Sequence, residues 1–289
     1  MKAAVIGAAG KMGSWFTRYF TEKGFETNVY DIDREGSKKV AEKYNARQAA
    51  DLNAAIIDAD VVLISVPIPM TPKVVLNVLE VVKDNAVVVE ITSFKQNVIG
   101  HLKTAERNAV TLLSLHPMFG YGTKSLSGHK MVVVQVKNIE REVAAAQTLF
   151  PDAEVIPTTA KKHDEAMATV LALTHFVNFV FASTLPIKDI EKIRRLSGTS
   201  FNLQLTLAES ILHDDPEFLA TLQKDNRYAI RSVNRLVKEA EALRTLVANK
   251  DRQELVTRLR SLKKLMKKDK QFEDAYKKMY EMMETLLGN

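Results

Sequence analysis

Cysteine is absent from this chain of 289 residues. Its absence excludes disulfide bonds, thiolate nucleophiles and zinc sites built on cysteine, and it is most easily reconciled with a reducing compartment. The chain also shows no secretory signal, because Lys2 leads straight into a short apolar run followed by glycines, with no long apolar region and no small-residue cleavage site. We therefore expect a cytoplasmic protein.

Metal-ligand spacing, internal repeats and low-complexity segments are also missing. The histidines and carboxylates show no pattern such as His-x-x-x-His, so the sequence predicts no metal site. The formal net charge of +6 allows a nucleic-acid partner, but the densest basic stretch, residues 258–270, alternates its charges with leucines at helical spacing and has no stacking aromatic residues. We interpret this stretch as a solvated helix face and expect no nucleic-acid partner.

Short β-rich runs alternate with amphipathic helical patterns up to about residue 158. Several of the runs are apolar on both faces, as buried parallel strands are, and the alternation is typical of a parallel sheet with crossover helices. The predicted strands are Ala3–Ile6, Thr27–Tyr30, Val61–Val66, Ala86–Ile91, Val110–Leu115 and Met131–Val136. The sequence therefore predicts an α/β fold that begins with a Rossmann-type, doubly wound parallel sheet, in a dinucleotide-binding domain of residues 1–158.

Long helical patterns with little glycine fill the rest of the chain and predict an all-helical domain of residues 159–289 for substrate binding and dimerisation. Its first helix includes Met167–Leu185, a nearly continuous apolar run that is long enough to span a membrane. His175 and Asn178 lie at the centre of this run, and no flanking topology signals accompany it. We interpret the run as a helix buried between domains or subunits, and we expect a homodimer and no membrane span.

The first predicted strand leads into three regularly spaced glycines, Gly7, Gly10 and Gly13. In a strand-turn-helix unit the first glycine permits the tight turn, the second lets the backbone approach a pyrophosphate, and the third lets helix and strand pack closely. Unpaired N–H groups at the start of the helix favour the phosphates. The pattern predicts a dinucleotide site formed by these glycines together with Lys11 and Met12.

Two residues after the second predicted strand bear on the choice of dinucleotide. Asp31 stands where an acidic residue takes the adenosine ribose hydroxyls and repels a 2′-phosphate, which favours NAD. Arg34 lies just beyond and offers a partner to a 2′-phosphate, so NADP stays open. Both residues are candidate cofactor contacts. A nicotinamide-dependent oxidoreductase is the expected class of protein.

Hydride transfer from an alcohol needs a group that accepts the hydroxyl proton, and histidine suits this near neutral pH. His116 ends a predicted strand and precedes Pro117 and a loop with two glycines, whereas His101, His129 and His213 lie in polar settings. The carboxyl ends of parallel strands form the edge where ligands bind in such sheets. The sequence therefore makes His116 the candidate catalytic residue.

The segment Leu115–Gly120 closely resembles the active-site segment of the prephenate dehydrogenase family. Three further segments agree with that family in order and approximate position: Thr92–Lys95 after a strand, His163-Asp164 at the start of the long helix, and Leu173–Phe176 within it. The similarity continues through the C-terminal helices, including Asn249–Gln253, and so covers essentially the whole chain.

The resemblance implies roles for four residues. His116 would hydrogen-bond the ring hydroxyl of the substrate and assist its deprotonation, with Ser93 orienting both groups. His175 would contribute to the substrate pocket, and Asp164 would belong to a polar network at the start of the helix. The implied reaction is the oxidative decarboxylation of prephenate to 4-hydroxyphenylpyruvate, with hydride transfer to the nicotinamide, on the route to tyrosine.

Three of these residues also suit ordinary structural roles. Ser93 suits a helix N-cap, and His175 suits a core histidine whose ring nitrogens are satisfied by the backbone. Asp164 suits the first turn of a helix, where the dipole favours a carboxylate. The residues alone leave both kinds of role open.

One region departs from the family pattern. Family members typically grip a substrate carboxylate with an arginine on the helix after the long one, because a guanidinium binds a carboxylate through two hydrogen bonds. The corresponding positions here hold Asn202 and Ser210, and neither replaces the charge. Other cations lie nearby in sequence, at Arg194, Arg195, Arg227 and Arg231, and one of them, from this chain or from a partner subunit, is a candidate for the same role. Two further alternatives stay open: arogenate dehydrogenase, whose substrate has an amine in place of the side-chain keto group, and a dinucleotide-binding regulatory protein without prephenate activity. A different hydroxyacid dehydrogenase would leave the resemblance around His116 unexplained.

Overall fold

The computed structural model describes residues 1–105 and 109–287. The chain divides into two compact units, unit 1 (Met1–Ala166) and unit 2 (Met167–Asn289). The predicted domain boundary, after residue 158, coincides with the end of strand β8 (Glu154–Thr158). The first turns of the helix that follows this strand belong to unit 1.

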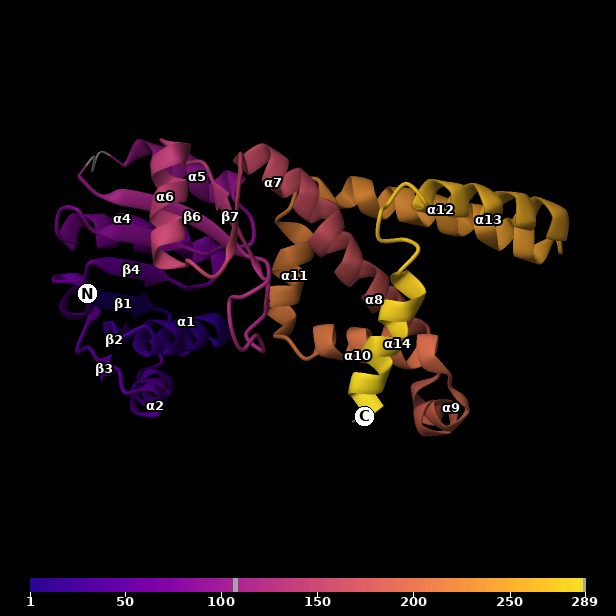
Figure 1. The fold of residues 1–289 in the computed structure, drawn as a ribbon, viewed down its shortest axis with the longest axis horizontal. Helices are drawn as coiled ribbons and strands as arrows, with labels where there is room; N and C mark the ends of the chain where they lie inside the picture. The colour runs from indigo at the N-terminus through magenta and orange to yellow at the C-terminus, as the bar shows by residue number, and fades with distance from the viewer. Residues whose placement is uncertain (106–108, 288–289) are drawn as a thin grey trace. The chain divides into compact units, whose positions relative to one another are not determined.

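Unit 1 is built on a sheet of eight strands in the order β3-β2-β1-β4-β5-β6-β7-β8 (Figure 1). The strands from β3 to β6 are parallel, β7 runs antiparallel to β6, and β8 is parallel to β7. The predicted Rossmann-type, doubly wound sheet is confirmed, because β3 to β6 have its strand order. The other strands are β1 (Lys2–Ile6), β2 (Glu26–Tyr30), β3 (Arg47–Gln48), β4 (Val61–Ile64), β5 (Val87–Glu90), β6 (Thr111–Pro117) and β7 (Lys130–Val134).

The two edge strands, β3 and β8, were not predicted. Strand β3 consists of two polar residues, and β8 contains Pro157, so neither shows the continuous apolar run that marks a buried strand. Strand β7 is an antiparallel addition to the predicted parallel sheet. The connection before it, residues 118–129, contains no helix in the structure, and a parallel neighbour would need a helical crossover.

Helices cover both faces of the sheet in unit 1. On one face lie α3 (Leu52–Ile56), α4 (Thr71–Val81), which follows the short η1 (Ile68–Met70), and α5 (Gln96–Thr104). On the other face lie α1 (Lys11–Glu22), α2 (Arg34–Tyr44) and α6 (Ile139–Leu149). Alternate strand residues point to opposite faces: in β4, Val62 and Ile64 join one apolar cluster, and Val61 and Leu63 join the other. Both faces are therefore buried, as the apolar strands predict.

The carboxyl ends of the parallel strands carry the segments expected to bind ligands. The strand order reverses between β1 and β4, and the loops that leave adjacent strands at such a point open a crevice. Gly7 follows β1 at this edge, Glu90 ends β5, and His116 lies near the end of β6. The fold thus brings the glycine turn and the candidate catalytic histidine to one edge of one sheet.

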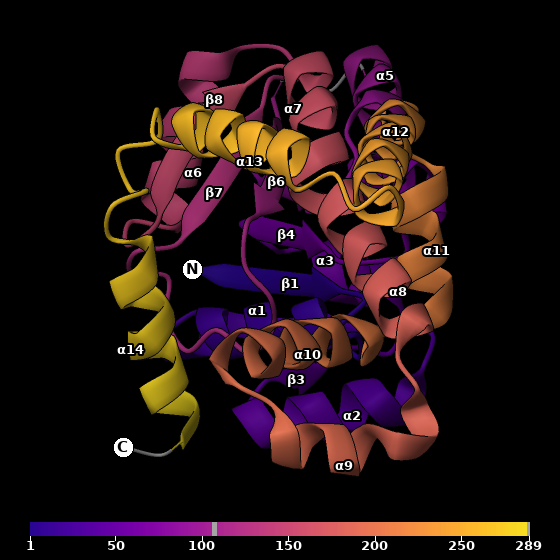
Figure 2. The same ribbon diagram turned by 90° about the vertical axis from the view of Figure 1, so that its right-hand side faces the viewer.

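Unit 2 is helical throughout its described residues, as predicted. Helix α8 packs against α10, and the two views show these helices side by side (Figure 1, Figure 2). The buried apolar residues of unit 2 are Met167, Ala168, Ala172, Leu205, Ala208, Ile211, Leu219, Leu222 and Ala229. The helices that follow α7 (Ala160–Met167) are η2 (Ala168–Leu173), α8 (Thr174–Thr184), η3 (Ile187–Asp189), α9 (Ile190–Leu196), α10 (Thr199–Leu212), α11 (Pro216–Lys224), α12 (Ala229–Ala248), α13 (Arg252–Met266) and α14 (Ala275–Leu287).

The predicted long apolar helix is continuous from Ala160 to Thr184 and contains a π-helical segment, η2. Among the described helices it alone is long and apolar enough to cross a membrane by length and composition, and its most apolar window is 22% buried within the chain. Val170, Val177 and Val180 are exposed on it. The three valines belong to the part of the helix that lies in unit 2, and the burial expected for this helix between domains or subunits stays a prediction.

Candidate functional site

Gly7 and Gly13 are both required by the turn between β1 and α1. Gly7 has a φ of 85°, and a Cβ at this residue would lie 2.2 Å from the carbonyl oxygen of Ser65. A Cβ at Gly13 would lie 2.0 Å from the carbonyl oxygen of Gly7. At the exposed Gly10, the atom nearest to a Cβ would be 3.4 Å away, so packing within the chain does not demand a glycine there. The open space beside Gly10 is compatible with the close approach of a pyrophosphate.

Lys11 and Met12 begin helix α1 beside this turn. The Nζ of the exposed Lys11 lies 4.7 Å from the ring centroid of Tyr121, and Met12 packs against the apolar cluster on the α1 face. The first turn of α1 contains no acidic side chain. Because the first N–H groups of a helix lack partners within it, this end attracts anions, and its position suits a pyrophosphate.

Asp31 and Arg34 both lie beyond the end of β2. The Asp31 carboxylate accepts hydrogen bonds from the backbone N–H of Ala9 at 2.9 Å and of Asp33 at 3.0 Å, which hold it against the glycine turn. The Arg34 guanidinium donates to the carbonyl oxygen of Ala49 at 2.8 Å. Asp31 is thus placed where a Rossmann-type sheet reads the adenosine ribose, and Arg34 is tethered nearby.

His116 is a buried histidine on β6, with 7% of its surface exposed. Its Nδ1 lies 2.9 Å from Nε2 of His163. Burial, the neighbouring His163 and the Lys95 ammonium hold the pKa of His116 well below its ordinary value of 6.5. The imidazole is therefore neutral near pH 7, which is the state that a proton acceptor needs.

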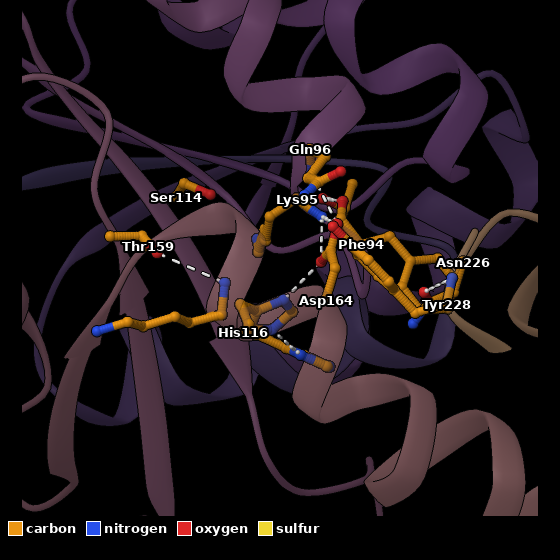
Figure 3. Close-up of polar contacts among 12 residues, drawn as sticks. Phe94, Lys95, Gln96, Ser114, His116, Thr159, Asp164, Asn226 and Tyr228 are labelled. Atoms are coloured by element: carbon orange, nitrogen blue, oxygen red, sulfur yellow. Dashed lines mark hydrogen bonds and ion pairs between the residues drawn. The ribbon is translucent and has the colours of Figure 1, made fainter. Parts of the chain in front are cut away.

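His163 and Asp164 link His116 to the loop after β5, and Figure 3 shows Asp164 beside Lys95 and Gln96 of that loop. The Nδ1 of His163 lies 2.8 Å from Oδ1 of Asp164. The same carboxylate accepts hydrogen bonds from the backbone N–H of Lys95 and of Gln96, each at 2.9 Å. Burial lowers the pKa of His163, although Asp164 acts to raise it. An unbroken series of contacts thus leads from β6 through α7 to the start of α5.

Lys95 and Glu90 form a buried ion pair beside these contacts. The Lys95 Nζ lies 2.8 Å from Glu90 Oε1, with 0% and 1% of the two side chains exposed. The same Nζ donates to the carbonyl oxygen of Leu115 at 2.6 Å. Glu90 also accepts hydrogen bonds from the backbone N–H and hydroxyl of Thr92, at 2.8 and 2.6 Å, and from the hydroxyl of Ser114. Burial lowers the pKa of Lys95 and Glu90 opposes this shift, so both charges are compensated inside the core.

The other two predicted residues have different surroundings. Ser93 is half-buried in the bend after β5, and in the described residues no hydrogen bond joins it to His116. His175 belongs to α8 in unit 2, where its buried Nδ1 has no hydrogen-bond partner in the described part of the chain. Burial lowers the pKa of His175. The substrate roles of Ser93 and His175 stay predictions.

Asn202 and Ser210, which stand where the family pattern has arginine, both lie on α10 and make local hydrogen bonds. Of the cations near them in sequence, Arg194 is paired with Glu209 at 2.6 Å. Unit 2 thus contains basic side chains in this region, but at other positions than the family's arginine.

The sequence prediction missed His163, Lys95 and Glu90 as members of the site. His163 and Lys95 belong to segments that resemble the family, but nothing in their local pattern shows that they are buried or which groups they contact. Lys95 lies four residues after the predicted strand Ala86–Ile91, and lysine is almost never fully buried unless it is paired, so its burial could not be expected from the local sequence. In residues 1–105 and 109–287, no group of three or more His, Asp or Glu side chains is arranged to hold a metal ion.

Two protein-family models match this chain. The model described as the nucleotide-binding domain of prephenate dehydrogenase matches residues 16–182, which is more than half of the chain. The chain belongs to the prephenate dehydrogenase family. The model described as the dimerization domain of prephenate dehydrogenase matches residues 159–261. The resemblance that the sequence motifs indicate is therefore confirmed.

Curated relatives agree with this family. A Methanocaldococcus jannaschii protein named probable arogenate/prephenate dehydrogenase is 28% identical over 259 residues, which make up 88% of this chain and 58% of the relative. A T-protein of Haemophilus influenzae is 28% identical over 256 residues, which make up 87% of this chain and 63% of the relative. The chain thus spans less than two thirds of the length of these two relatives.

Solved structures of family members share the fold. The prephenate dehydrogenase of Aquifex aeolicus, solved with hydroxyphenyl propionate and NAD+, aligns with a TM-score of 0.73 at 21% identity, over 93% of this chain and 99% of that one. The arogenate dehydrogenase of Synechocystis aligns with a TM-score of 0.68 at 17% identity, again over 93% and 99%. These likenesses confirm the predicted combination of a Rossmann-type sheet and a helical C-terminal region.

Proposed function

We propose that this protein is an NAD-dependent prephenate dehydrogenase in which His116 is the proton acceptor. The observation that carries the proposal is the state of His116: a buried, neutral imidazole at the ligand edge of the sheet, held through Nδ1 by a second histidine. Membership of the family and the resemblance of the segment around His116 support the same reaction.

The glycine turn and its surroundings fit a dinucleotide. Gly10 leaves space for close approach of a pyrophosphate, the start of α1 attracts phosphate charge, and Asp31 favours NAD over NADP. The Aquifex aeolicus enzyme was solved with NAD+, which supports the choice of cofactor. When bound, the nicotinamide supplies the acceptor for the hydride.

Nε2 of His116 would accept the proton of the ring hydroxyl, while the hydride leaves the ring carbon that bears this hydroxyl. Loss of the ring carboxylate as carbon dioxide then leaves the electrons of the broken C–C bond in the ring, which becomes aromatic. The proton returns to the oxygen and gives 4-hydroxyphenylpyruvate. General-base assistance of this kind contributes about 10²- to 10⁴-fold to a rate. The product lies on the route to tyrosine, and the absence of cysteine supports a cytoplasmic enzyme.

Ser93 and His175 are further proposed contacts of the substrate, as the family resemblance implies. Ser93 directly follows the end of β5, the strand next to that of His116, so its hydroxyl is proposed to orient the ring hydroxyl of the substrate. His175 has a buried nitrogen without a partner among the described residues, which supports a role in binding a ligand group. Asp164 acts indirectly, through His163.

A homodimer formed through unit 2 is part of the proposal. The dimerization-domain match covers most of the helices of this unit. Exposed valines line α8, at Val177 and Val180, and exposed leucines line α13, at Leu259, Leu262 and Leu265. A second copy of the unit would bury such side chains, which a lone chain leaves in water.

The test of this function is a substrate comparison with the wild-type protein. Reduction of NAD and of NADP is followed at 340 nm with prephenate and with arogenate, and the aromatic product is identified. We expect turnover with prephenate and NAD, with 4-hydroxyphenylpyruvate and carbon dioxide as products. Faster turnover with arogenate, giving tyrosine, would correct the substrate. No turnover with either substrate would contradict the proposal.

A further inference from the structure

The carboxylate of Asp164 determines which atom carries the proton in its hydrogen bond with His163. It accepts hydrogen bonds from the backbone N–H groups of Lys95 and Gln96, and these groups can only donate. An ionised carboxylate has no proton to give, so its third contact, with Nδ1 of His163 at 2.8 Å, requires the proton to be on the histidine. His163 is therefore protonated at Nδ1.

The state of His163 then determines the tautomer of His116. Burial lowers the pKa of His163, so its imidazole carries a single proton, and Nε2 is left as an acceptor. Nδ1 of His116 lies 2.9 Å from this acceptor and must donate to it. Because His116 is also neutral, its own Nε2 carries no proton and presents a lone pair.

We propose that His163 is a positioning residue that, with Asp164, holds His116 in the one tautomer able to accept the substrate's proton. The proposal rests on the proposed function to the extent that His116 is the base. In the opposite tautomers the lone pair of His163 Nδ1 would face the carboxylate and the hydrogen bond to Asp164 would be lost, while the hydrogen bond between the two histidines would reverse its direction. Once His116 accepts a proton at Nε2, its positive charge is separated from the Asp164 carboxylate by one imidazole ring.

Lys95 makes this arrangement rigid, because it binds at both ends of the series of contacts that runs from Asp164 through His163 to His116. Its backbone N–H binds the Asp164 carboxylate, and its ammonium binds the carbonyl oxygen of Leu115, the residue before His116. Glu90 fixes the ammonium in turn. The charged groups around the histidine pair are thus Lys95, Glu90 and Asp164, all of them in unit 1.

The direct test is the tautomer of each histidine in the full-length protein, read from the ring nitrogens by ¹⁵N NMR at pH 7.5. Signals are assigned with His116→Asn and His163→Gln. We expect a protonated Nδ1 and an unprotonated Nε2 in both residues. A protonated Nε2 on His116 would overturn the proposal. The measurement needs no substrate, so its result stands apart from success or failure of the proposed function.

A pair of variants at residue 163 gives the kinetic test. His163→Leu removes the acceptor for His116 Nδ1, and we expect kcat to fall about 100-fold with little change in KM for NAD. In His163→Gln the side-chain oxygen can occupy the place of Nε2 and accept the same hydrogen bond, so kcat should recover to within about 10-fold of wild type. Thermal unfolding of both variants checks that they fold.

Equal kcat values for His163→Leu and His163→Gln would overturn the positioning role, since a residue that only fills space makes no use of an acceptor atom. A wild-type kcat in His163→Leu would overturn it as well. If His163→Leu fails to fold, the tautomer of His116 in the wild type and the kcat of His163→Gln still test the positioning role. A wild type without turnover on prephenate or arogenate would instead count against the proposed function.

Discussion

Unit 1 and unit 2 differ in how completely each buries its own apolar side chains. Unit 1 covers both faces of its sheet and forms two extensive clusters. Unit 2 buries few apolar residues and leaves other apolar side chains on its helices exposed, including those of Val177, Val180 and Leu262. The difference teaches that unit 1 buries its apolar side chains within itself, whereas unit 2 leaves apolar surface of the kind that the proposed homodimer would cover.

One ion pair from each unit shows the same contrast. In unit 1 the Lys95–Glu90 pair is buried and joined to further hydrogen bonds. In unit 2 the Arg194–Glu209 pair is about half exposed, with 43% and 54% of the side chains accessible. Removing one partner of a buried ion pair lowers the free energy of unfolding strongly, because the other charge is left buried without compensation, whereas an exposed pair contributes little to stability.

The largest effect that we predict comes from breaking the buried pair. Lys95→Met leaves Glu90 as an uncompensated charge and should lower the free energy of unfolding of unit 1 by about 3–5 kcal/mol. Arg194→Met, the matched change in unit 2, should cost at most about 1 kcal/mol. Urea titrations followed by the fluorescence of Trp15, the only tryptophan and a core residue of unit 1, and by circular dichroism measure the two effects. Equal losses would remove the contrast between the units.

The next prediction concerns the partner of unit 2. Replacing both Val177 and Val180 with Asp places charges on the exposed apolar face of α8 and should weaken the homodimer at least about 100-fold. Ile57→Asp is the matched control, because Ile57 is a residue of unit 1 with 56% of its own surface exposed, and it should leave the dimer intact. Sedimentation velocity over a range of concentrations measures both. A double variant that stays dimeric would place the interface elsewhere.

A smaller effect is expected from pH on unit 1. Burial lowers the pKa values of His116 and His163 in the folded unit. Below pH 6.5 these histidines are therefore protonated in the unfolded chain before they are protonated in the folded unit. The free energy of unfolding should therefore be constant above this range and fall as the pH drops below 6.5, by up to about 1.4 kcal/mol per pH unit for each histidine.

Urea midpoints from Trp15 fluorescence between about pH 5 and 8 measure this slope. His116→Asn should reduce it by the share of one histidine. His101→Asn, at an exposed histidine of the same unit, should leave it unchanged. A slope that survives the loss of His116 would show that other groups cause it.

The smallest predicted effect is on cofactor choice. Asp31→Ala removes a negative charge from the end of β2 and should shift the ratio of kcat/KM for NADP over NAD by about 10-fold in favour of NADP. Asp31→Asn keeps a hydrogen-bond acceptor for the backbone of Ala9 but loses the charge, so it should shift the ratio similarly. An unchanged ratio in both variants would show that Asp31 does not read the ribose.

Local pattern accounts for the parts of the fold that could be predicted. Strands such as β4 and β5 are apolar on both faces, and the glycine turn is a short-range feature, so both are visible in the sequence. The edge strand β3 and the π-helical segment Ala168–Leu173 have no such pattern. Strand pairing and tertiary packing produce these two elements, and neither can be predicted from the pattern of neighbouring residues in the sequence.

The site was predictable only where its residues follow a strand end or a recognised motif. His116 and the glycines met that condition. The partner of His116 is 47 positions away in sequence, on a helix that follows two further strands, and only the folded sheet brings the two rings together. The burial of Lys95 likewise depends on Glu90 and on the backbone of the neighbouring strand.

The most direct test of the role of unit 1 is the turnover of His116→Asn with prephenate and NAD, with His101→Asn as control. Asn keeps a polar side chain but has no basic nitrogen, so we predict that kcat falls about 1,000-fold while the affinity for NAD stays near wild type. His101→Asn should match the wild type. Wild-type kcat in His116→Asn would contradict the assignment of the proton acceptor and, with it, the chemistry assigned to unit 1.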